Sequence, residues 1–251
     1  MSQYTRLLIG SILPTNVIKV LYLDCDTLIL GNVLKIWNLN LADKIIAALP
    51  DVFSPAYRRN IGLHRESIMF NSGVMLIDLR HWRENNTEAK LLEVIDVYHG
   101  RVQQGDQGVL NAVLSNEVVA LDPRDNSISL FFDFSYEEML ILRKPLSTFT
   151  QEELNMAINH PRIVHFTTSF ASTRPWYLGP ASQKYSAIWR DYYSQTEWAN
   201  EPLEEKKISF LKKIMMMIYS GLPREIAIRI AGLSHAIFRP GVTRLKQFFL
   251  R

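Results

Sequence analysis

Hydrophobic residues occur along the chain in short runs, and the most continuous run lies near its beginning. Six of the seven residues of Val17–Leu23 are apolar or aromatic, and β-branched residues are common among them. A run of this kind is typical of a strand buried on both faces of a largely parallel sheet. Such a strand needs parallel neighbours joined by crossover connections. The pattern therefore predicts an α/β protein with a mixed, mainly parallel sheet.

The rest of the chain alternates between apolar segments and segments rich in turn residues. Residues 2–13 are typical of a short helix closed by Pro14, and residues 87–98 have the apolar spacing of a longer helix. We expect further strands at 45–49, 74–79 and 163–166, one or two strands within 118–136, and a helical turn at 34–41. Residues 50–65 form a polar, basic loop of the kind that often closes over a site.

Two acids follow the first predicted strand directly. Asp24 and Asp26 lie one residue apart at its carboxyl end, and in open α/β sheets ligands bind outside the carboxyl ends of the strands. Paired carboxylates suit a hard divalent cation, such as Mg²⁺ or Mn²⁺, that stays partly open to substrate phosphates. The alternative is a turn in which one acid caps the next element.

Polar residues at two other positions allow a structural and a functional interpretation. Asn71, Ser72 and Gly73 precede the strand at 74–79, where they form either a close approach to a ligand or an ordinary turn. Asp106 precedes a helix-like segment, and helix N-capping is the simpler interpretation of this residue.

A histidine and an arginine follow in the last part of the predicted domain. His165 lies on the apolar strand 163–166, where a lone histidine is more often a satisfied core residue than a ligand. Arg174 begins an Arg-Pro-Trp turn, and its planar set of donors suits a phosphate.

Composition agrees with one folded domain and an appendage. The chain has 251 residues, of which 47% are hydrophobic, so a sizeable core is expected. Its single cysteine, Cys25, excludes an internal disulfide and agrees with a reducing compartment. The residues after Met1 lack the apolar stretch of a secretion signal, and no apolar run reaches the length of a membrane span.

Charge is distributed unevenly along the chain. Residues 203–251 carry ten Lys or Arg against three Glu, a balance of +7, which leaves −4 for residues 1–202. We therefore divide the chain into a domain, 1–202, and a basic amphipathic helical tail, 203–251, whose partner we expect to be separate from the acid-lined site.

The tail interleaves large apolar residues with Lys and Arg, which is typical of helices that lie in a membrane interface. The alternative is a set of helices packed on the domain with a solvated basic face. Nucleic acid is not expected, because neither a recognition motif nor an aromatic platform accompanies the basic residues.

Five short motifs occur in order along the chain: YTRL at 4–7, LYLDCD at 21–26, FNSGV at 70–74, GDQ at 105–107, and VHF with RPW between 164 and 176. Together they resemble the family 8 glycosyltransferases, retaining enzymes that include bacterial lipopolysaccharide galactosyl- and glucosyltransferases. The resemblance covers about residues 1–180. It implies the GT-A type nucleotide-sugar transferase fold.

The resemblance also implies roles for particular residues. Asp24, Asp26 and His165 would bind a divalent metal, usually Mn²⁺, that bridges the diphosphate of a UDP-sugar donor, which replaces the core interpretation of His165. A Lewis acid on these oxygens stabilises the charge that develops when the glycosidic bond breaks. Arg6, Asn71 and Arg174 would contact the donor, while Asp106 and Gln107 would act at the catalytic centre by positioning the sugar.

The expected function is the transfer of a hexose from a UDP-sugar to a saccharide or lipid-linked acceptor in cell-surface polysaccharide synthesis. The tail places this activity on the cytoplasmic, inner face of the cell membrane. Family members begin with a strand-helix-strand unit that grips the uracil and ribose, and the resemblance implies that this chain starts after that unit. The alternatives are a truncated, catalytically impaired relative acting as a membrane-associated interaction module, and a metal-dependent phosphotransfer enzyme or hydrolase. No phosphate-cradling glycine loop supports the last of these.

Overall fold

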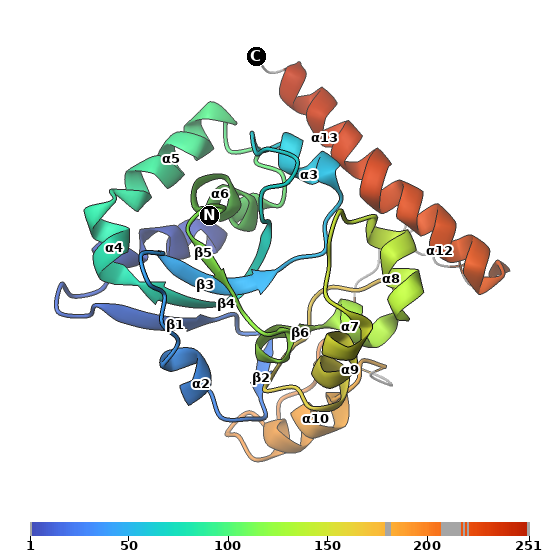
Figure 1. Ribbon diagram of the computed structural model, residues 1–251. Helices are drawn as coiled ribbons and strands as arrows, with labels where there is room; N and C mark the ends of the chain where they lie inside the picture. The colour runs from blue at the N-terminus through green and yellow to red at the C-terminus, as the bar shows by residue number, and fades with distance from the viewer. Residues whose placement is uncertain (1, 179–181, 207–216, 218, 220, 250–251) are drawn as a thin grey trace.

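The computed structural model describes residues 2–178, 182–206, 217, 219 and 221–249. A mixed four-stranded sheet lies at its centre, in the order β1-β4-β3-β5 (Figure 1). Its strands are β1 (Lys19–Leu23), β3 (Ile46–Pro50), β4 (Phe70–Asp78) and β5 (Val118–Ala120). A second sheet, in the order β2-β7-β6, contains β2 (Thr27–Ile29), β7 (Ile163–His165) and β6 (Ser127–Ile128). The predicted α/β class is confirmed.

The sheet differs from its predicted form in two respects. Antiparallel pairings, β1 with β4, β3 with β4 and β2 with β7, outnumber the parallel pairings β3 with β5 and β6 with β7 among the described residues, so "mainly parallel" is wrong. Strand β1 pairs with β4 alone in that part of the chain, and all five of its residues are only partly buried. The strand that is buried on both faces is instead β4, which lies between β1 and β3.

The hydrophobic run in β1 has a different cause from the predicted one. Val20 and Tyr22 pack against the core on one face of the sheet, and Leu21 and Leu23 pack against the core on the other face. Because successive side chains of a strand point to opposite faces, both sets must be apolar even though the strand lies at an edge.

One face of the four-stranded sheet is covered by N-terminal and central helices. These are η1 (Ser2–Leu8, a 3₁₀-helix), α1 (Ile9–Ile12), α4 (Leu79–Glu84), α5 (Thr87–Val97) and α6 (Gly105–Leu114). Leu7, Trp82, Leu91 and Leu110 of this layer are buried in one core cluster with Met75 of β4. The helices predicted at 2–13 and 87–98 are thereby confirmed.

The opposite face meets α2 (Leu34–Trp37), η2 (Pro123–Asn126) and the second sheet, with Ile36 and Ile163 in a shared core cluster. Beyond them lie α7 (Ser129–Asp133), α8 (Tyr136–Arg143), α9 (Gln151–Asn159) and α10 (Ser186–Ser194), while α3 (Pro55–Arg59) lies in the basic loop. The segment 118–136 was predicted as strand alone, which is partly wrong. The residues that follow β6 form helix α7 instead. Its Leu130 and Phe131 are buried because they pack against the neighbouring helices α8 and α9.

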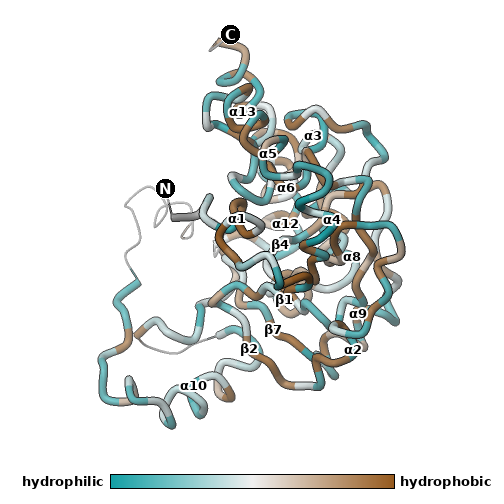
Figure 2. Tube along the Cα trace, turned by 90° about the vertical axis from the view of Figure 1, so that its left-hand side faces the viewer, coloured by the Kyte–Doolittle hydropathy of each residue, from teal (hydrophilic) through white to brown (hydrophobic). Residues whose placement is uncertain are grey.

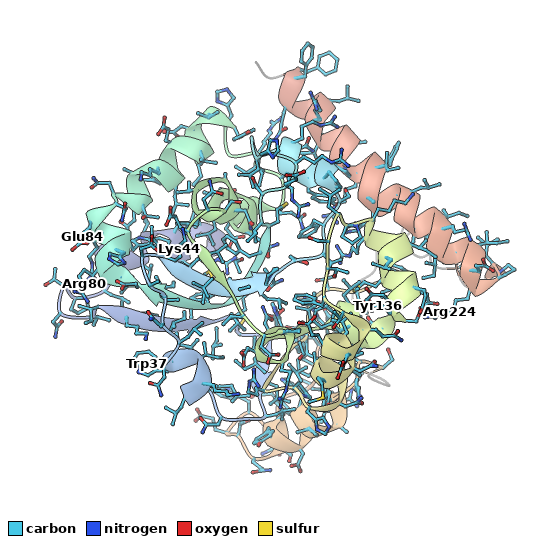
Figure 3. All side chains as sticks on the ribbon, in the orientation of Figure 1. Trp37, Lys44, Arg80, Glu84, Tyr136 and Arg224 are labelled. Atoms are coloured by element: carbon cyan, nitrogen blue, oxygen red, sulfur yellow. The ribbon has the colours of Figure 1, made fainter. Side chains whose placement is uncertain are left out.

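The last described segment is a continuous helical rod along the outside of α8 and α3 (Figure 1). It comprises α12 (Arg224–Leu233), a π-helical turn η3 (Ser234–Phe238) and α13 (Arg239–Phe248). Ile228 and Ala231 are buried against α8, and Arg224 forms an ion pair with Glu138 near Tyr136 at the start of α8 (Figure 3). Asn60 also donates to the Pro240 carbonyl at 2.7 Å. Residues 221–249 thus pack onto the domain, whereas most of the helix expected around 208–219 lies outside the described residues.

No helix in the described part of the chain combines the length and the apolar character needed to cross a membrane.

Close approach of α12 to α8 depends on Gly232. A Cβ atom at this position would lie 2.4 Å from the Ile141 carbonyl oxygen, whereas a Cβ atom at Gly241 of α13 would meet open space. We expect Gly232→Ala to lower the free energy of unfolding by about 1–3 kcal/mol, because it overpacks the junction. Gly241→Ala, the matched control, should be neutral or stabilise by up to about 1 kcal/mol through helix propensity. Urea unfolding measures both, and effects of equal sign would contradict the proposed contact.

Candidate active site

Three side chains with metal-binding atoms converge at the junction of the two sheets. Asp24 and Asp26 lie in the turn between β1 and β2, and His165 ends β7. One ligand atom from each of the three lies within 4.8 Å of the others. His165 Nε2 is 3.1 Å from Asp26 Oδ1 and 3.9 Å from Asp24 Oδ2. The structure therefore brings together the three residues predicted as metal ligands.

Backbone pairing holds this cluster in place. Strand β2 pairs antiparallel with β7 so that Thr27 lies opposite His165, and the Phe166 N–H donates to the Asp26 carbonyl at 2.8 Å. On the other side, the Asp24 N–H donates to the Gly73 carbonyl at 2.8 Å. The cluster is thus tied to both sheets.

Gly73 makes room for the histidine ring. A Cβ atom on Gly73 would lie 2.1 Å from His165 Cε1 and 3.0 Å from Asp24 Oδ2. Of the two interpretations offered by the sequence, residues 71–73 are no turn: they lie within β4, and Gly73 permits the close approach of the site's own side chains.

A chain of hydrogen bonds orients the imidazole. The backbone N–H of Gly73 donates to Asn71 Oδ1, which identifies that atom as oxygen and allows it to accept from Asn126 Nδ2 at 2.9 Å. Asn126 Oδ1 therefore accepts from His165 Nδ1–H at 3.0 Å. His165 Nε2 then faces two carboxylates: in the imidazolium it donates to Asp26, and in the neutral imidazole it presents a lone pair on the same side as their oxygens. Three acceptors that converge in this way fit a divalent cation.

Arg6 links one side of the cluster to helix α6. Its guanidinium lies 3.1 Å from Asp24 Oδ1 and 2.5 Å from Asp106 Oδ2, and it donates to the Ser72 carbonyl at 2.9 Å. Burial lowers the pKa of Arg6, but the charges of Asp106 and Asp24 outweigh burial and raise it. The N-cap of α6 is Gln104 and not Asp106, so the capping interpretation of Asp106 is wrong.

Arg174 closes the opposite side. It lies 3.2 Å from Asp26 Oδ2, donates to Thr168 Oγ1 and stacks over the Trp176 ring. Burial raises the pKa of Asp26, but the hydrogen bond from His165 and the charges of His165 and Arg174 outweigh it, so the pKa lies below its ordinary value. Asp26 is therefore ionised at neutral pH.

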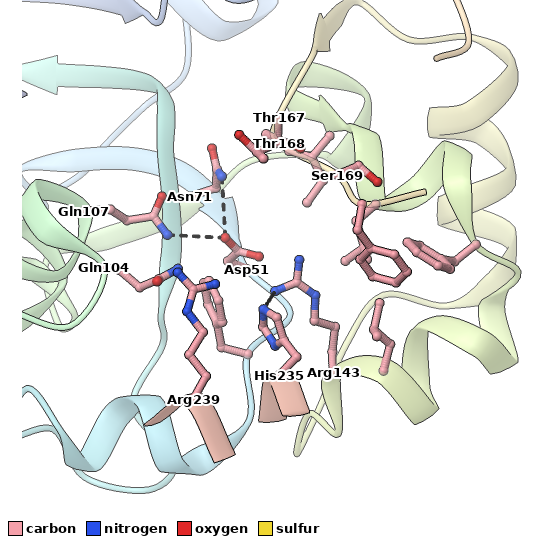
Figure 4. Close-up of a pocket in the computed structure, with 16 residues that line it drawn as sticks. Asp51, Asn71, Gln104, Gln107, Arg143, Thr167, Thr168, Ser169, His235 and Arg239 are labelled. Atoms are coloured by element: carbon pink, nitrogen blue, oxygen red, sulfur yellow. Dashed lines mark hydrogen bonds between the residues drawn. The ribbon is translucent and has the colours of Figure 1, made fainter. Parts of the chain in front are cut away.

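A cavity of about 490 Å³ opens beside the cluster. Asp51, Asn71 and Gln107 form one wall, and residues 167–170, which follow His165, form another (Figure 4). Asp51 Oδ2 accepts from Gln107 Nε2 at 3.4 Å and from Asn71 Nδ2 at 3.5 Å. Asn71 therefore belongs to both the cavity wall and the hydrogen-bond chain that orients His165.

The C-terminal rod contributes to the same cavity. His235 and Arg239 line it together with Asp51, and Arg143 of α8 completes this side (Figure 4). Arg239 also lies in a neighbouring cavity lined by Asp24 and Asp106. The rod therefore lies beside the acid-lined site, because α12 and α13 pack against α8 and α3. The expectation that the partner of the tail is separate from this site stays a prediction.

The structure gathers all the predicted site residues around one region, but sequence reasoning missed several neighbours. Asp51 had a usable signal, since it follows a predicted strand, as Asp24 does. Asn126, Arg143 and Arg239 carry no local motif. Asn126, for example, hydrogen-bonds Asn71 and His165, which lie 55 and 39 residues away along the chain.

Comparison with known proteins assigns the class. The profile of the family described as "Glycosyl transferase family 8" matches residues 1–178. Solved structures of the galactosyltransferase LgtC, which have the GT-A fold, superpose with TM-scores of 0.62 for an active-site mutant and 0.61 for a complex with donor and acceptor sugar analogues. Sequence identity is 22% and 21%, over 78% and 84% of this chain and 70% and 69% of LgtC. The chain has a GT-A fold and belongs to glycosyltransferase family 8.

Relatives of similar sequence occur in Bacillus subtilis and Streptococcus pneumoniae. General stress protein A of Bacillus subtilis is 29% identical over 200 residues, which are 78% of this chain and 66% of that protein. Glycosyltransferase GlyA of Streptococcus pneumoniae is 29% identical over 180 residues, 72% of this chain and 22% of GlyA. The chain thus spans two-thirds or less of the length of these relatives.

The contact between Gly73 and His165 can be tested by a double-mutant cycle. We expect Gly73→Ala to lower the free energy of unfolding by about 1–3 kcal/mol, because the new methyl group overlaps the imidazole ring. The same substitution in a His165→Ala background should cost clearly less, since the ring atoms are gone. Chemical denaturation of the four proteins measures the coupling free energy between the two substitutions. Additive losses of unfolding free energy would show that the two residues are not in steric contact.

Proposed function

We propose that this family 8 glycosyltransferase transfers a hexose from a UDP-sugar to a saccharide or lipid-linked acceptor in cell-surface polysaccharide synthesis, with retention of configuration. The observation that carries the proposal is the cluster of Asp24, Asp26 and His165 beside a cavity walled by Asn71 and Gln107. A cation site next to a polar cavity suits a substrate with a diphosphate at one end and a sugar at the other.

The residues of the cluster fit a divalent metal. Two carboxylates and one imidazole would hold it, and the nitrogen ligand favours Mn²⁺ over Mg²⁺, which prefers oxygen ligands. When bound, the metal supplies Lewis-acid stabilisation of the departing diphosphate. Arg174, which lies beside Asp26, would add a charged hydrogen bond to the same phosphates.

Other side chains of the site position the sugar. Asn71 and Gln107 both contact Asp51, so their amides are held in fixed orientations at the cavity wall. The Asp106 carboxylate forms an ion pair with Arg6 at 2.5 Å, and a carboxylate held in an ion pair is a poor nucleophile. This supports positioning roles for Asp106 and Gln107, with front-face attack of the acceptor hydroxyl on an oxocarbenium-like centre. Arg6 would hold Asp24 and Asp106 at the donor.

Loss of one metal ligand tests this function. We expect Mn²⁺ and UDP together to raise the melting temperature of the wild type, since a ligand at 100 times its Kd stabilises a protein by about 2.7 kcal/mol. Asp26→Asn should abolish this metal-dependent stabilisation and transfer from UDP-sugars, while the fold persists. Asp43→Asn, which removes an exposed acid, is the matched control. Unchanged Mn²⁺-dependent UDP binding in Asp26→Asn would refute the metal assignment, and no UDP effect in the wild type would favour the catalytically impaired relative.

We further propose that the C-terminal rod attaches the enzyme to the inner face of the cell membrane. Large apolar residues are exposed along one helical stripe at Ile226, Ile230, Leu233, Ile237, Leu245 and Phe248. Arg229, Arg244 and Lys246 are exposed beside them, and hydrophobic and hydrophilic segments alternate along α13 (Figure 2). Apolar burial combined with basic residues suits an anionic lipid surface.

Substitution of the stripe tests membrane attachment without removing the rod, whose other face belongs to the core. We expect Leu233→Gln with Ile237→Gln to reduce co-sedimentation with vesicles that contain anionic lipid. Leu92→Gln with Val97→Gln, which removes exposed apolar residues from α5, should have no effect. Raising the salt concentration should weaken binding of the wild type, because charges are screened over about 8–10 Å at physiological ionic strength. Equal sedimentation of all three proteins would refute the attachment surface.

A further inference from the structure

An arginine at the end of α8 faces the cavity without a carboxylate partner. Arg143 points from α8 into the space between Asp51 and Thr168 (Figure 4). Its Nη1 is 2.8 Å from His235 Nε2, which is its one hydrogen-bond partner in the described part of the chain. Its Nε is buried and has no partner there. A guanidinium that has unpaired N–H donors at a cavity wall can bind an anion through charged hydrogen bonds.

Its neighbours hold the guanidinium in place but do not neutralise it. Burial and the charges of Arg143 and Arg239 lower the pKa of His235 to about 3, so the imidazole is neutral at physiological pH and its Nε2 accepts from Arg143. The guanidinium carbon also lies 5.4 Å from the centroid of the Phe53 ring. Burial lowers the pKa of Arg143, yet a guanidinium stays protonated near neutral pH. The cation is therefore fixed in orientation.

The one acid among the residues lining this cavity, Asp51, already accepts hydrogen bonds from other residues. Asp51 accepts hydrogen bonds from the Val52 N–H, Asn71 and Gln107. Within the described residues, neither Arg143 nor Arg239 forms an ion pair. Two guanidinium groups thus share a cavity with one carboxylate, which leaves an excess positive charge. Hydroxyl groups of Thr167, Thr168 and Ser169 line the facing wall.

We propose that the sugar acceptor of this enzyme is anionic, and that Arg143 binds its phosphate or carboxylate group with Arg239 at the rim. This inference rests on the proposed glycosyl transfer: the donor sugar would lie at the wall of Asn71 and Gln107, and the acceptor would occupy the side of the same cavity lined by Arg143 and Arg239. A neutral saccharide would leave the guanidinium N–H groups buried and unpaired. The site should therefore bind a neutral saccharide more weakly than an anionic one. Arg143 and Arg239 would therefore select charged over neutral saccharides.

Binding of small probes without metal tests the proposal. With EDTA present, glucose 6-phosphate, glucuronate, inorganic phosphate and glucose are titrated into the full chain by calorimetry or ligand-observed NMR. We expect at least one of the two charged sugars to bind, glucose to bind at least about tenfold more weakly, and Arg143→Met to weaken the charged sugar by at least about tenfold. Comparison of glucose 6-phosphate with glucuronate distinguishes a phosphate from a carboxylate, and inorganic phosphate reports whether the sugar contributes.

Controls separate this site from the donor site. Arg80→Gln, which removes an exposed charge from α4, should change none of these affinities. Arg143→Lys should restore part of the affinity lost in Arg143→Met, and Arg239→Gln provides a second variant if Arg143→Met does not fold. Equal binding of glucose and both charged sugars, or no effect of Arg143→Met and Arg239→Gln, would overturn the proposal.

UDP with Mn²⁺ is titrated in parallel. We expect its binding to survive Arg143→Met, because Arg143 lies outside the metal cluster and its cavity lining is shared with neither Asp24 nor Asp26. If Arg143→Met weakens UDP as much as glucose 6-phosphate, the anion bound is the donor diphosphate, and the acceptor inference is wrong. If wild type binds a charged sugar through Arg143 but shows no UDP effect, the anion site stands and the proposed transferase function fails.

Discussion

The carboxylates of Asp24 and Asp26 lie close together at the junction of two sheets, and the surrounding structure opposes their mutual repulsion. Arg6 pairs with Asp24, while His165 and Arg174 pair with Asp26. These charges come from opposite ends of the described domain, so the site forms only when the first helix and the strand β7 pack against the same turn. Gly73 permits this packing, because any side chain there would occupy the space of the imidazole.

The amide side chains beside the cluster of Asp24, Asp26 and His165 connect it with the cavity wall. Asn71 accepts from Asn126, which orients His165, and donates to Asp51 in the cavity wall. Gln107 contacts Asp51 and Ser72 from helix α6, and Asn111 of the same helix pairs with both backbone groups of Phe70. Helix and strand are thus locked in register, and the residues that would meet the two ends of a nucleotide sugar share one hydrogen-bond network.

The C-terminal rod has two faces with different surroundings. Its small and apolar residues, such as Ala231 and Gly232, pack on α8, and His235 and Arg239 reach the cavity. Its other face exposes Leu233 and Ile237. Under the proposed membrane attachment, the cavity that receives the acceptor would lie next to the surface that carries lipid-linked saccharides. Arg143 and Arg239 would then act on an acceptor delivered along that surface.

The sequence by itself determined the α/β class, most strands, the helices at 2–13 and 87–98, and the three residues Asp24, Asp26 and His165, because these follow from local hydrophobic patterns and short motifs. It did not predict α3, α4, α7, α8, α9 or α10 as helices. Hydrophobic periodicity did not determine strand direction or position: β1 is apolar on both faces, as a central strand would be, yet it pairs with β4 alone among the described strands. Only the tertiary structure decided that Asp51, Asn126, Arg143 and Arg239 join the site. Their contacts form between segments far apart in the chain, and such contacts depend on how helices and sheets pack, which no local pattern records.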